Sequence, residues 1–224
     1  MGVAKAPPRA PRSKRARSID TAAKYMDAAE ALFIRFGYEG TSIRAISARA
    51  KMTLGTVVYH WGTKEALFRD ICLSRFGYIE QEQVRRLQAC EANWQPGAAA
   101  NLDAILRALI EPPLLLPTDA RIAQTTRLLY GRVLTDPSPV VLKVTVEIFR
   151  EASDLFRRLS RRCLPDLDED VFHWRYTCGI GAFVFAQSFG HRVSYAHSIE
   201  GPHTNWQEVC DEIVKFVLAG LLAD

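Results

Sequence analysis

The chain has 224 residues, of which 48% are hydrophobic and 24% are charged. This balance is ordinary for a folded protein and excludes both wholesale disorder and a fibrous class. The length suits a small domain joined to a larger one, each with its own core.

Positive charge is concentrated at the front of the chain. The formal net charge is only +4, but a run of basic residues precedes the first acid, Asp20: Lys5, Arg9, Arg12, Lys14, Arg15 and Arg17. The same stretch contains prolines and no apolar run, so it cannot be a secretory signal. We expect a flexible basic arm over residues 1–17, with a solubilising tail and a mitochondrial-type presequence as the alternatives.

The cysteines and histidines indicate neither disulfides nor a metal site. The five cysteines are odd in number, far apart and never paired at zinc-ligand spacing, which is typical of reduced cytoplasmic thiols. His191, His197 and His203 are six residues apart, which matches no standard set of metal ligands. The most apolar stretch, residues 171–189, is interrupted by polar side chains and indicates a buried helix. We therefore expect a cytoplasmic protein without a membrane segment, a metal or another cofactor.

Two helices are predicted in the first 50 residues. Apolar residues with helical spacing predict the first over residues 21–36, and Gly37 provides its stop. A short second helix follows over residues 41–50. Thr41 and Ser42 are its candidate N-caps, because a side-chain oxygen at that position accepts a hydrogen bond from the first turn.

A third helix, as short as the second, is expected to begin after Thr53. It buries Val57 and Trp61, which lie four residues apart and therefore on one face. A glycine ends it, and Thr63 then caps a long fourth helix that runs to about Cys90. Two short helices thus flank a tight turn.

The remainder of the chain is also helical in pattern. Breaks rich in proline separate apolar segments, and they fall near residues 95–97, 112–117, 136–139 and 165. Asp168 is the predicted N-cap of a long apolar helix, and Thr204 with Gln207 forms a capping box for the last helix. Residues 191–203 are expected to form a loop between these two helices. The sequence contains no useful strand pattern and no phosphate-binding glycine loop.

These elements predict an all-α protein in three parts: a basic arm over residues 1–17, a three-helix domain over residues 18–65 and a larger bundle over residues 66–224. The short helices of the three-helix domain have the order of a helix-turn-helix. In that geometry the second short helix enters the major groove of DNA while the first crosses the backbone. The order of helices alone is weak evidence for DNA binding, and specific residues in these helices are needed as well.

Several motifs in the three-helix domain resemble the tetracycline-repressor family in order and in spacing. The first set is similar to the first two helices of that family: Ala28-Ala29-Glu30-Ala31-Leu32-Phe33, Phe36-Gly37-Tyr38, Thr41-Ser42-Ile43-Arg44 and Ile46. The second set is similar to its recognition helix and fourth helix: Gly55-Thr56, Tyr59-His60-Trp61 and Thr63-Lys64-Glu65-Ala66-Leu67-Phe68. The resemblance implies a homodimeric transcriptional repressor with an N-terminal DNA-binding domain and a C-terminal sensor domain.

The resemblance also implies that residues around the turn and the recognition helix contact DNA. Their chemistry agrees, because hydroxyl and aromatic side chains can reach phosphates or base edges and Gly55 lets the backbone approach the duplex. Lys64, at a helix N-terminus, can attract a phosphate. The candidate DNA-binding residues are Thr41, Ser42, Arg44, Thr53, Leu54, Gly55, Thr56, Tyr59, His60 and Lys64.

Three positions depart from the family pattern. Lys51 stands where a turn glycine is usual, Leu54 where a polar residue is common, and Val58 where a phosphate-contacting tyrosine is frequent. Leu54 can instead touch thymine methyl groups. Core packing is the favoured interpretation of Val57 and Trp61. The threonines and the histidine of this region would also be ordinary caps and surface side chains in any helical protein.

For the C-terminal domain, the resemblance implies an inducer site and a dimer interface formed by the last two helices. The helix that starts near Asp168 has two apolar stripes, one through Trp174 and the other through Phe183, so it contacts more than one partner. Residues 136–139 and 164–167 resemble family members that regulate fatty-acid metabolism. We predict a small apolar effector, such as a fatty acyl compound, bound by Leu128, Phe149, Trp174, Cys178 and Phe185.

Two other functions stay open. One is a DNA-binding regulator that senses no small molecule, which a filled C-terminal core would favour. The other is a helical enzyme with Cys163 or Cys178 as its nucleophile and a base such as His173, but no family signature surrounds either cysteine. We favour a repressor that binds double-stranded operator DNA as a homodimer and is released by its ligand.

Overall fold

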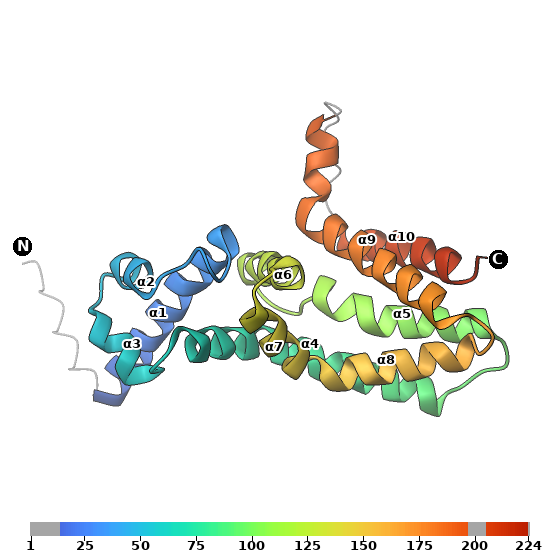
Figure 1. Ribbon diagram of the computed structural model, residues 1–224, viewed down its shortest axis with the longest axis horizontal. Coiled ribbons are helices and arrows are strands. Elements are labelled where there is room, and N and C mark those ends of the chain that lie inside the picture. Colours follow the sequence, from blue (N-terminus) through green and yellow to red (C-terminus); the bar gives the residue numbers. More distant parts are fainter. Residues whose placement is uncertain (1–13, 197–204, 224) are drawn as a thin grey trace, which may run out of the picture. The chain divides into compact units, whose positions relative to one another are not determined.

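The computed structural model describes the backbone of residues 14–196 and 205–223, and the side chains of residues 21–188 and 205–223. Over this part of the chain there are ten helices and no strand, which confirms the predicted all-α fold (Figure 1). None of these helices is long and apolar enough to cross a membrane. Most of the predicted basic arm lies outside the described residues, and residues 14–17 begin the first helix.

The chain divides into two compact units, Met1–Phe68 and Arg69–Asp224. The first unit contains α1 (Lys14–Phe36), α2 (Ile43–Ala50), α3 (Leu54–His60) and the start of α4 (Lys64–Ala92). The rest of α4 belongs to the second unit, with α5 (Ala98–Leu114), α6 (Ala120–Thr135), α7 (Pro139–Ile148), α8 (Arg150–Cys163), α9 (Glu169–Ala196) and α10 (Trp206–Leu221). The boundary therefore falls inside α4, and this one helix supplies residues to both units.

Aromatic side chains form the centre of the first unit. Phe33 of α1 meets Phe68 of α4 edge to face, with ring centroids 5.1 Å apart. Tyr38, in the turn after α1, packs against both rings at 5.8 and 5.2 Å. Such pairs contribute about 0.5–1.5 kcal/mol each beyond the burial of their area. Ile46 and Val57 complete this core and are also buried.

Tyr25 connects the two short helices to α1. Its side chain is fully buried, and its hydroxyl lies within hydrogen-bonding distance of the Ser47 hydroxyl in α2. The same hydroxyl lies 3.2 Å from the carbonyl oxygen of Thr53, the residue that precedes α3. Ser47 itself donates to the carbonyl of Ile43 at 2.9 Å. One phenol group of α1 therefore contacts both α2 and the residue that precedes α3.

The turn between α2 and α3 requires an unusual backbone conformation. Lys51 ends α2 in the left-handed region, at φ 57° and ψ 44°, and is the one residue other than glycine with positive φ among those the structure describes. This region costs a residue with a Cβ about 1–2 kcal/mol. The backbone geometry thus explains why glycine is the usual residue here in the family that the sequence resembles.

Lys64 braces the turn between α1 and α2. Its ammonium donates hydrogen bonds to the carbonyl oxygens of Tyr38 and Thr41, at 3.0 and 3.2 Å, and lies 4.0 Å from the centroid of the Tyr38 ring. Thr41 is buried and donates its hydroxyl hydrogen to the carbonyl of Gly37 at 2.8 Å. Two of the three ammonium N–H groups of Lys64 are therefore used within the chain.

The predicted caps in the second half of the chain have mixed outcomes. Asp168 caps α9 as predicted, accepting from the N–H groups of Asp170 and Val171. The cap of α10 is Asn205, which accepts from the N–H of Gln207 at 3.1 Å, whereas Thr204 lies outside the described residues. The loop predicted from residue 191 was wrong at its start, because α9 continues to residue 196.

The second unit is a bundle in which α10 packs on α5 and α9, while α6 packs on α7 and α9. An ion pair supports the contact of α10 with α5, because Arg107 donates to Asp211 at 2.6 Å. Gly179 permits the contact of α9 with α10. A Cβ at this position would lie 2.9 Å from a methyl carbon of Val217, which is closer than real packing allows.

Two prolines lie inside the last turn of α5, where a break was predicted instead. A proline has no N–H, so Pro113 cannot donate to the carbonyl of Leu109, four residues earlier. The side chain of Gln83 in α4 replaces the missing donor, and its Nε2 lies 2.7 Å from that carbonyl oxygen. α5 continues through Pro112 to Leu114, and a side chain of the neighbouring α4 supplies the donor that Pro113 lacks.

Replacing Lys51 with glycine should stabilise the protein by about 0.5–1 kcal/mol. Glycine adopts the left-handed conformation without a Cβ clash, although the greater freedom of the unfolded chain offsets part of the gain. Urea unfolding measures the change in the free energy of unfolding. The matched control is Lys51→Ala, which removes the ammonium but keeps the strain and should not stabilise. Equal stability of the two variants would contradict the strain argument.

Lys64→Met should destabilise the free protein by about 1–3 kcal/mol. The methionine keeps a long unbranched side chain but leaves the carbonyls of Tyr38 and Thr41 without their charged donor. Thermal and urea unfolding without DNA measure the loss. If the only role of Lys64 were to contact a phosphate, these experiments would show no change.

Candidate functional site

The first candidate site is the outer face of α3. Val57 points into the core and is 1% exposed, whereas Tyr59 is 82% and Val58 66% exposed. Leu54 and Gly55, one helical turn before Val58 and Tyr59, are exposed as well. Residues four positions apart share a helical face, so these four form one surface. Its combination of a phenol group, branched apolar side chains and a bare backbone position suits contact with base edges and thymine methyl groups.

Hydroxyl and basic side chains border this face. Thr53 occupies the N-cap position of α3 but makes no capping hydrogen bond, and its Oγ1 lies 3.2 Å from that of Thr56. Ser42 caps α2 by accepting from the N–H of Ala45 at 3.1 Å and stays exposed. Arg44 is exposed on the same short helix. Groups of this kind are the ordinary ligands of DNA phosphates.

The structure divides the ten candidate DNA-binding residues into three groups. Six are exposed: Ser42, Arg44, Thr53, Leu54, Gly55 and Tyr59. Thr56 and His60 are half-buried, and the His60 ring lies between Tyr59 and Trp61 at centroid distances of 5.0 and 5.2 Å. Thr41 and Lys64 are engaged inside the unit. Val58 was missed as a candidate, although the burial expected for Val57 already determines that its neighbour faces outward.

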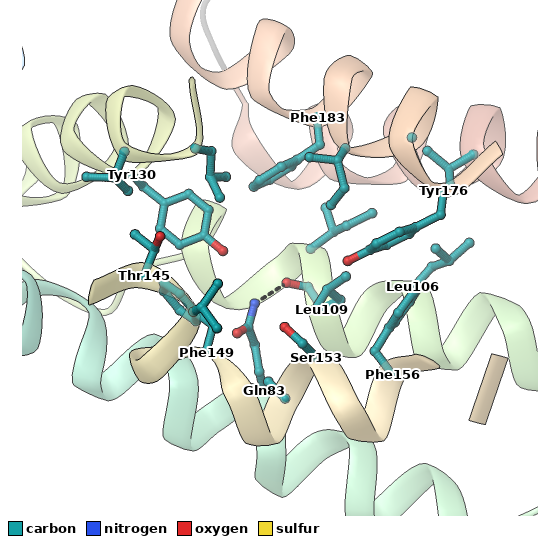
Figure 2. Close-up of a pocket in the computed structure, with 18 of the residues that line it drawn as sticks. Gln83, Leu106, Leu109, Tyr130, Thr145, Phe149, Ser153, Phe156, Tyr176 and Phe183 are labelled. Atoms are coloured by element: carbon teal, nitrogen blue, oxygen red, sulfur yellow. Dashed lines mark hydrogen bonds between the residues drawn. The ribbon is translucent and has the colours of Figure 1, made fainter. Parts of the chain in front are cut away.

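The second candidate site is a cavity in the second unit, with a volume of about 260 Å³. Helices α4 to α10 all contribute to its wall, which is mainly apolar (Figure 2). Side chains labelled in the figure are Gln83, Leu106, Leu109, Tyr130, Thr145, Phe149, Ser153, Phe156, Tyr176 and Phe183. Small-molecule pockets are typically apolar enclosures of roughly 300–1,000 Å³ with a few polar groups. This one lies just below the lower end of that range.

Aromatic rings make up much of the cavity wall. Tyr130 packs against Phe149 at 5.4 Å and against Phe183 at 6.0 Å, and Tyr176 stacks on Phe156 at 4.9 Å. Burial raises the pKa of Tyr176 to about 12. Burial also raises the pKa of Tyr130, and hydrogen bonding with Gln83 only partly opposes this. Both phenols therefore keep their hydrogen at neutral pH.

The cavity has few other polar groups. Thr145 already donates its hydroxyl hydrogen to the carbonyl of Val141 at 2.8 Å. Asp136 accepts from the N–H of Ser138 at 3.0 Å and lies 3.6 Å from Nε of Arg132. Within the described part of the chain, the wall contains no lysine, arginine or histidine. Its electrostatic character is therefore neutral to slightly negative.

Gln83 is the polar residue that stands out in this wall. It is 1% exposed, and its Oε1 has no hydrogen-bond partner within the described residues. Sequence reasoning missed it. A signal was present, however, because Gln83 lies one helical turn from Ile79 and from Leu87, which are both fully buried. A glutamine in the middle of an apolar stripe is unusual enough to mark a polar contact inside the core.

Of the five residues predicted to bind the ligand, Phe149 lines the cavity. The other four lie elsewhere. Leu128, Trp174, Cys178 and Phe185 are exposed and are absent from the wall. Trp174, Cys178 and Phe185 miss the cavity because α9 has two apolar stripes, and the stripe with Tyr176, Ile180 and Phe183 faces it. Leu128 is in α6, which turns Tyr130 and Val133 toward the cavity instead.

The other stripe of α9 belongs to an exposed apolar face shared with α10. These two helices pack side by side, and their exposed large apolar residues include Val171, Trp174, Phe185, Phe216 and Leu222. Trp174 and Phe216 are 64% and 67% exposed. Exposed apolar side chains on two neighbouring helices make this face a candidate for association with another protein.

The other sites considered from the sequence gain no support. Cys163 is buried, and burial raises the pKa of its thiol, which opposes formation of the thiolate that a nucleophile requires. Over the described residues, no cluster of histidine, cysteine and acidic side chains could hold a metal ion. None of the three histidines considered as metal ligands, His191, His197 and His203, has its side chain among the described residues.

Two family models match the chain, one on each unit. The model of bacterial regulatory proteins of the tetR family matches residues 26–71, and that of the tetracyclin repressor-like C-terminal domain matches residues 107–220. The A-factor receptor protein of Streptomyces griseus is 37% identical over 71 residues. That match covers 32% of this chain and 26% of the relative, so it spans about a quarter of that protein.

Solved structures show the same fold over most of the chain. A bacterial regulatory protein of the tetR family from Rhodococcus RHA1 has a TM-score of 0.55 at 19% identity, covering 94% of this chain and 98% of that one. The transcriptional regulator FadR from Bacillus subtilis, in complex with stearoyl-CoA, has a TM-score of 0.54 at 12% identity, covering 88% and 98%. Together with the two family models, these matches show that the chain belongs to the tetracycline-repressor (TetR) family of transcriptional regulators, whose members bind operator DNA and act as dimers.

Proposed function

We propose that this protein is a homodimeric transcriptional repressor that reads its operator with α3 and is released from it by a small apolar ligand. The observation that carries the proposal is the orientation of α3. With Val57 anchored in the core, the opposite side of the helix presents Tyr59, Leu54 and Val58 to a partner. Exposed apolar and aromatic side chains on a short, rigidly held helix fit direct contact with the major groove.

The candidate DNA-binding residues then have different roles. Tyr59 and the backbone at Gly55 meet the duplex directly, and Leu54 and Val58 lie against thymine methyl groups. Ser42, Arg44 and the threonine hydroxyls of α3 bind phosphates, while His60 lies at the edge of the surface. Thr41 and Lys64 position the helices, because their polar groups already bond within the chain.

The cavity of the second unit is the proposed ligand site. Support comes from its apolar wall, its enclosure by seven helices, and the participation of α4, which carries Gln83 in the cavity and Lys64 in the first unit. FadR from Bacillus subtilis was solved in complex with stearoyl-CoA, and that complex motivates a fatty acyl compound as one candidate ligand here. A volume of about 260 Å³ favours a shorter chain than stearoyl.

The exposed apolar face of α9 and α10 is the proposed dimer interface. A second copy of the chain can bury the same residues on both sides of a two-fold axis, as a symmetric dimer requires. Such a dimer matches an operator with two inverted half-sites. Trp174, Cys178 and Phe185, first considered as ligand contacts, are reassigned to this interface.

Tyr59→Ala should weaken operator binding by about 1–3 kcal/mol and leave the stability of the free protein within about 0.5 kcal/mol. The operator is first selected by the wild-type protein from duplexes of random sequence, and fluorescence anisotropy then gives both affinities. Val57→Ala is the matched control, because loss of buried methyl groups should lower stability by about 1–3 kcal/mol. An operator without inverted half-sites, or a Tyr59→Ala variant with unchanged affinity, would contradict the proposal.

Ligand and operator should weaken each other's binding by the same factor. A hundredfold preference of the ligand for the DNA-free state corresponds to about 2.7 kcal/mol. Operator affinity is measured with and without saturating 1-octanol, and 1-octanol affinity with and without operator. If operator DNA and 1-octanol bind independently of each other, the protein is a DNA-binding regulator that this class of small molecule does not control.

A further inference from the structure

The polar end of the cavity has a fixed orientation. The carbonyl of Leu109 has no helical donor because Pro113 lacks an N–H, so the amide of Gln83 must direct Nε2 toward it, at 2.7 Å (Figure 2). An amide that points its nitrogen one way points its oxygen the other way. Oε1 of Gln83 is therefore left as a buried acceptor without a partner within the described residues.

An unfilled buried acceptor is a site for a hydrogen-bond donor. Leaving such a group unpaired costs about 1–3 kcal/mol, which a donor on a bound molecule recovers in part. The nearby hydroxyl groups do not serve this purpose. Thr145 donates to the carbonyl of Val141. Burial raises the pKa of Tyr130 and hydrogen bonding with Gln83 lowers it in part, the effect expected when the phenol oxygen accepts, and Oε1 of Gln83 remains without a donor.

The side chains of the cavity wall disfavour an anionic ligand. The described wall contains no cationic side chain, and its one acid, Asp136, is already paired with Arg132. Burying a carboxylate without a counterion is strongly unfavourable. The two tyrosines supply neutral O–H groups, which can donate to a ligand oxygen but cannot neutralise a full charge.

We propose that the ligand of this cavity is a short, neutral, apolar molecule whose polar end is a hydroxyl or an amide N–H that donates to Oε1 of Gln83. This inference rests on the proposed function, in which the cavity is the sensor site. It narrows the ligand class from apolar compounds in general to uncharged molecules with a hydrogen-bond donor. Ionised free fatty acids do not belong to this class.

Three probes with eight carbon atoms separate these classes on the wild-type protein. 1-Octanol and 1-methoxyheptane are isomers, and only the alcohol has a donor; octanoate has the same chain length and carries a negative charge. Isothermal titration calorimetry at pH 7.5 should show 1-octanol binding roughly three- to tenfold more tightly than the ether, as one net hydrogen bond predicts. Octanoate should bind more weakly than both.

A pair of variants tests the assigned residue. In Gln83→Met the preference for the alcohol should disappear, because the acceptor is gone while the volume of the side chain is similar. Gln88→Met, at an exposed position of the same helix, should keep the wild-type ratio. If Gln83→Met does not fold, the probe series on the wild-type protein still decides the ligand class.

The outcomes are distinguishable. An ether that equals the alcohol, or octanoate as the tightest probe, would overturn the inference and leave the cavity as an apolar sensor site. A Gln83→Met variant that keeps the alcohol preference would overturn the role of Gln83. Failure of all three probes to bind would overturn the proposed ligand control itself, and the inference with it.

Discussion

The DNA-facing surface depends on a helix that is too short to be stable alone. Helices below roughly 12–15 residues are marginal in water, and α3 has 7 residues. Its orientation therefore comes from outside: from Val57 in the core and from the contact of Tyr25 with the backbone at Thr53. The strained turn at Lys51 places the start of α3 within reach of that phenol. Display of Tyr59 is thus a consequence of tertiary packing of the first unit.

Features set by local chemistry could be predicted from the sequence. Thr63 and Asp168 cap their helices as expected, because a cap depends on residues within one turn. The inward position of Val57 followed from its spacing, whereas Trp61, also expected in the core, lies just after α3 and is only half-buried. The role of Lys64 could not be predicted in this way, since its acceptors at Tyr38 and Thr41 lie on a different segment that only folding brings near.

The ligand cavity was harder to predict, for a physical reason. A helix such as α9, apolar on several sides, presents more than one stripe, and its sequence does not tell which stripe faces a neighbour and which faces solvent. From the sequence, Trp174 and Phe183 were equally good candidates for facing the cavity, and only the packing of α9 against α6 and α10 distinguishes them. The role of Gln83 depends on the packing of two helices. A proline in α5 leaves a carbonyl without its helical donor, and the amide of Gln83 in α4 donates to that carbonyl instead.

The exposed face of α9 and α10 has a consequence for how this protein must be handled. Trp174 and Phe216 leave large apolar areas in water in the single chain, and members of the family act as dimers. In the proposed dimer, burial of these side chains would couple folding to association, so the midpoint of unfolding should rise with protein concentration by mass action. A melting temperature of this protein should therefore be given with the protein concentration, because dilution of the proposed dimer weakens its folded state.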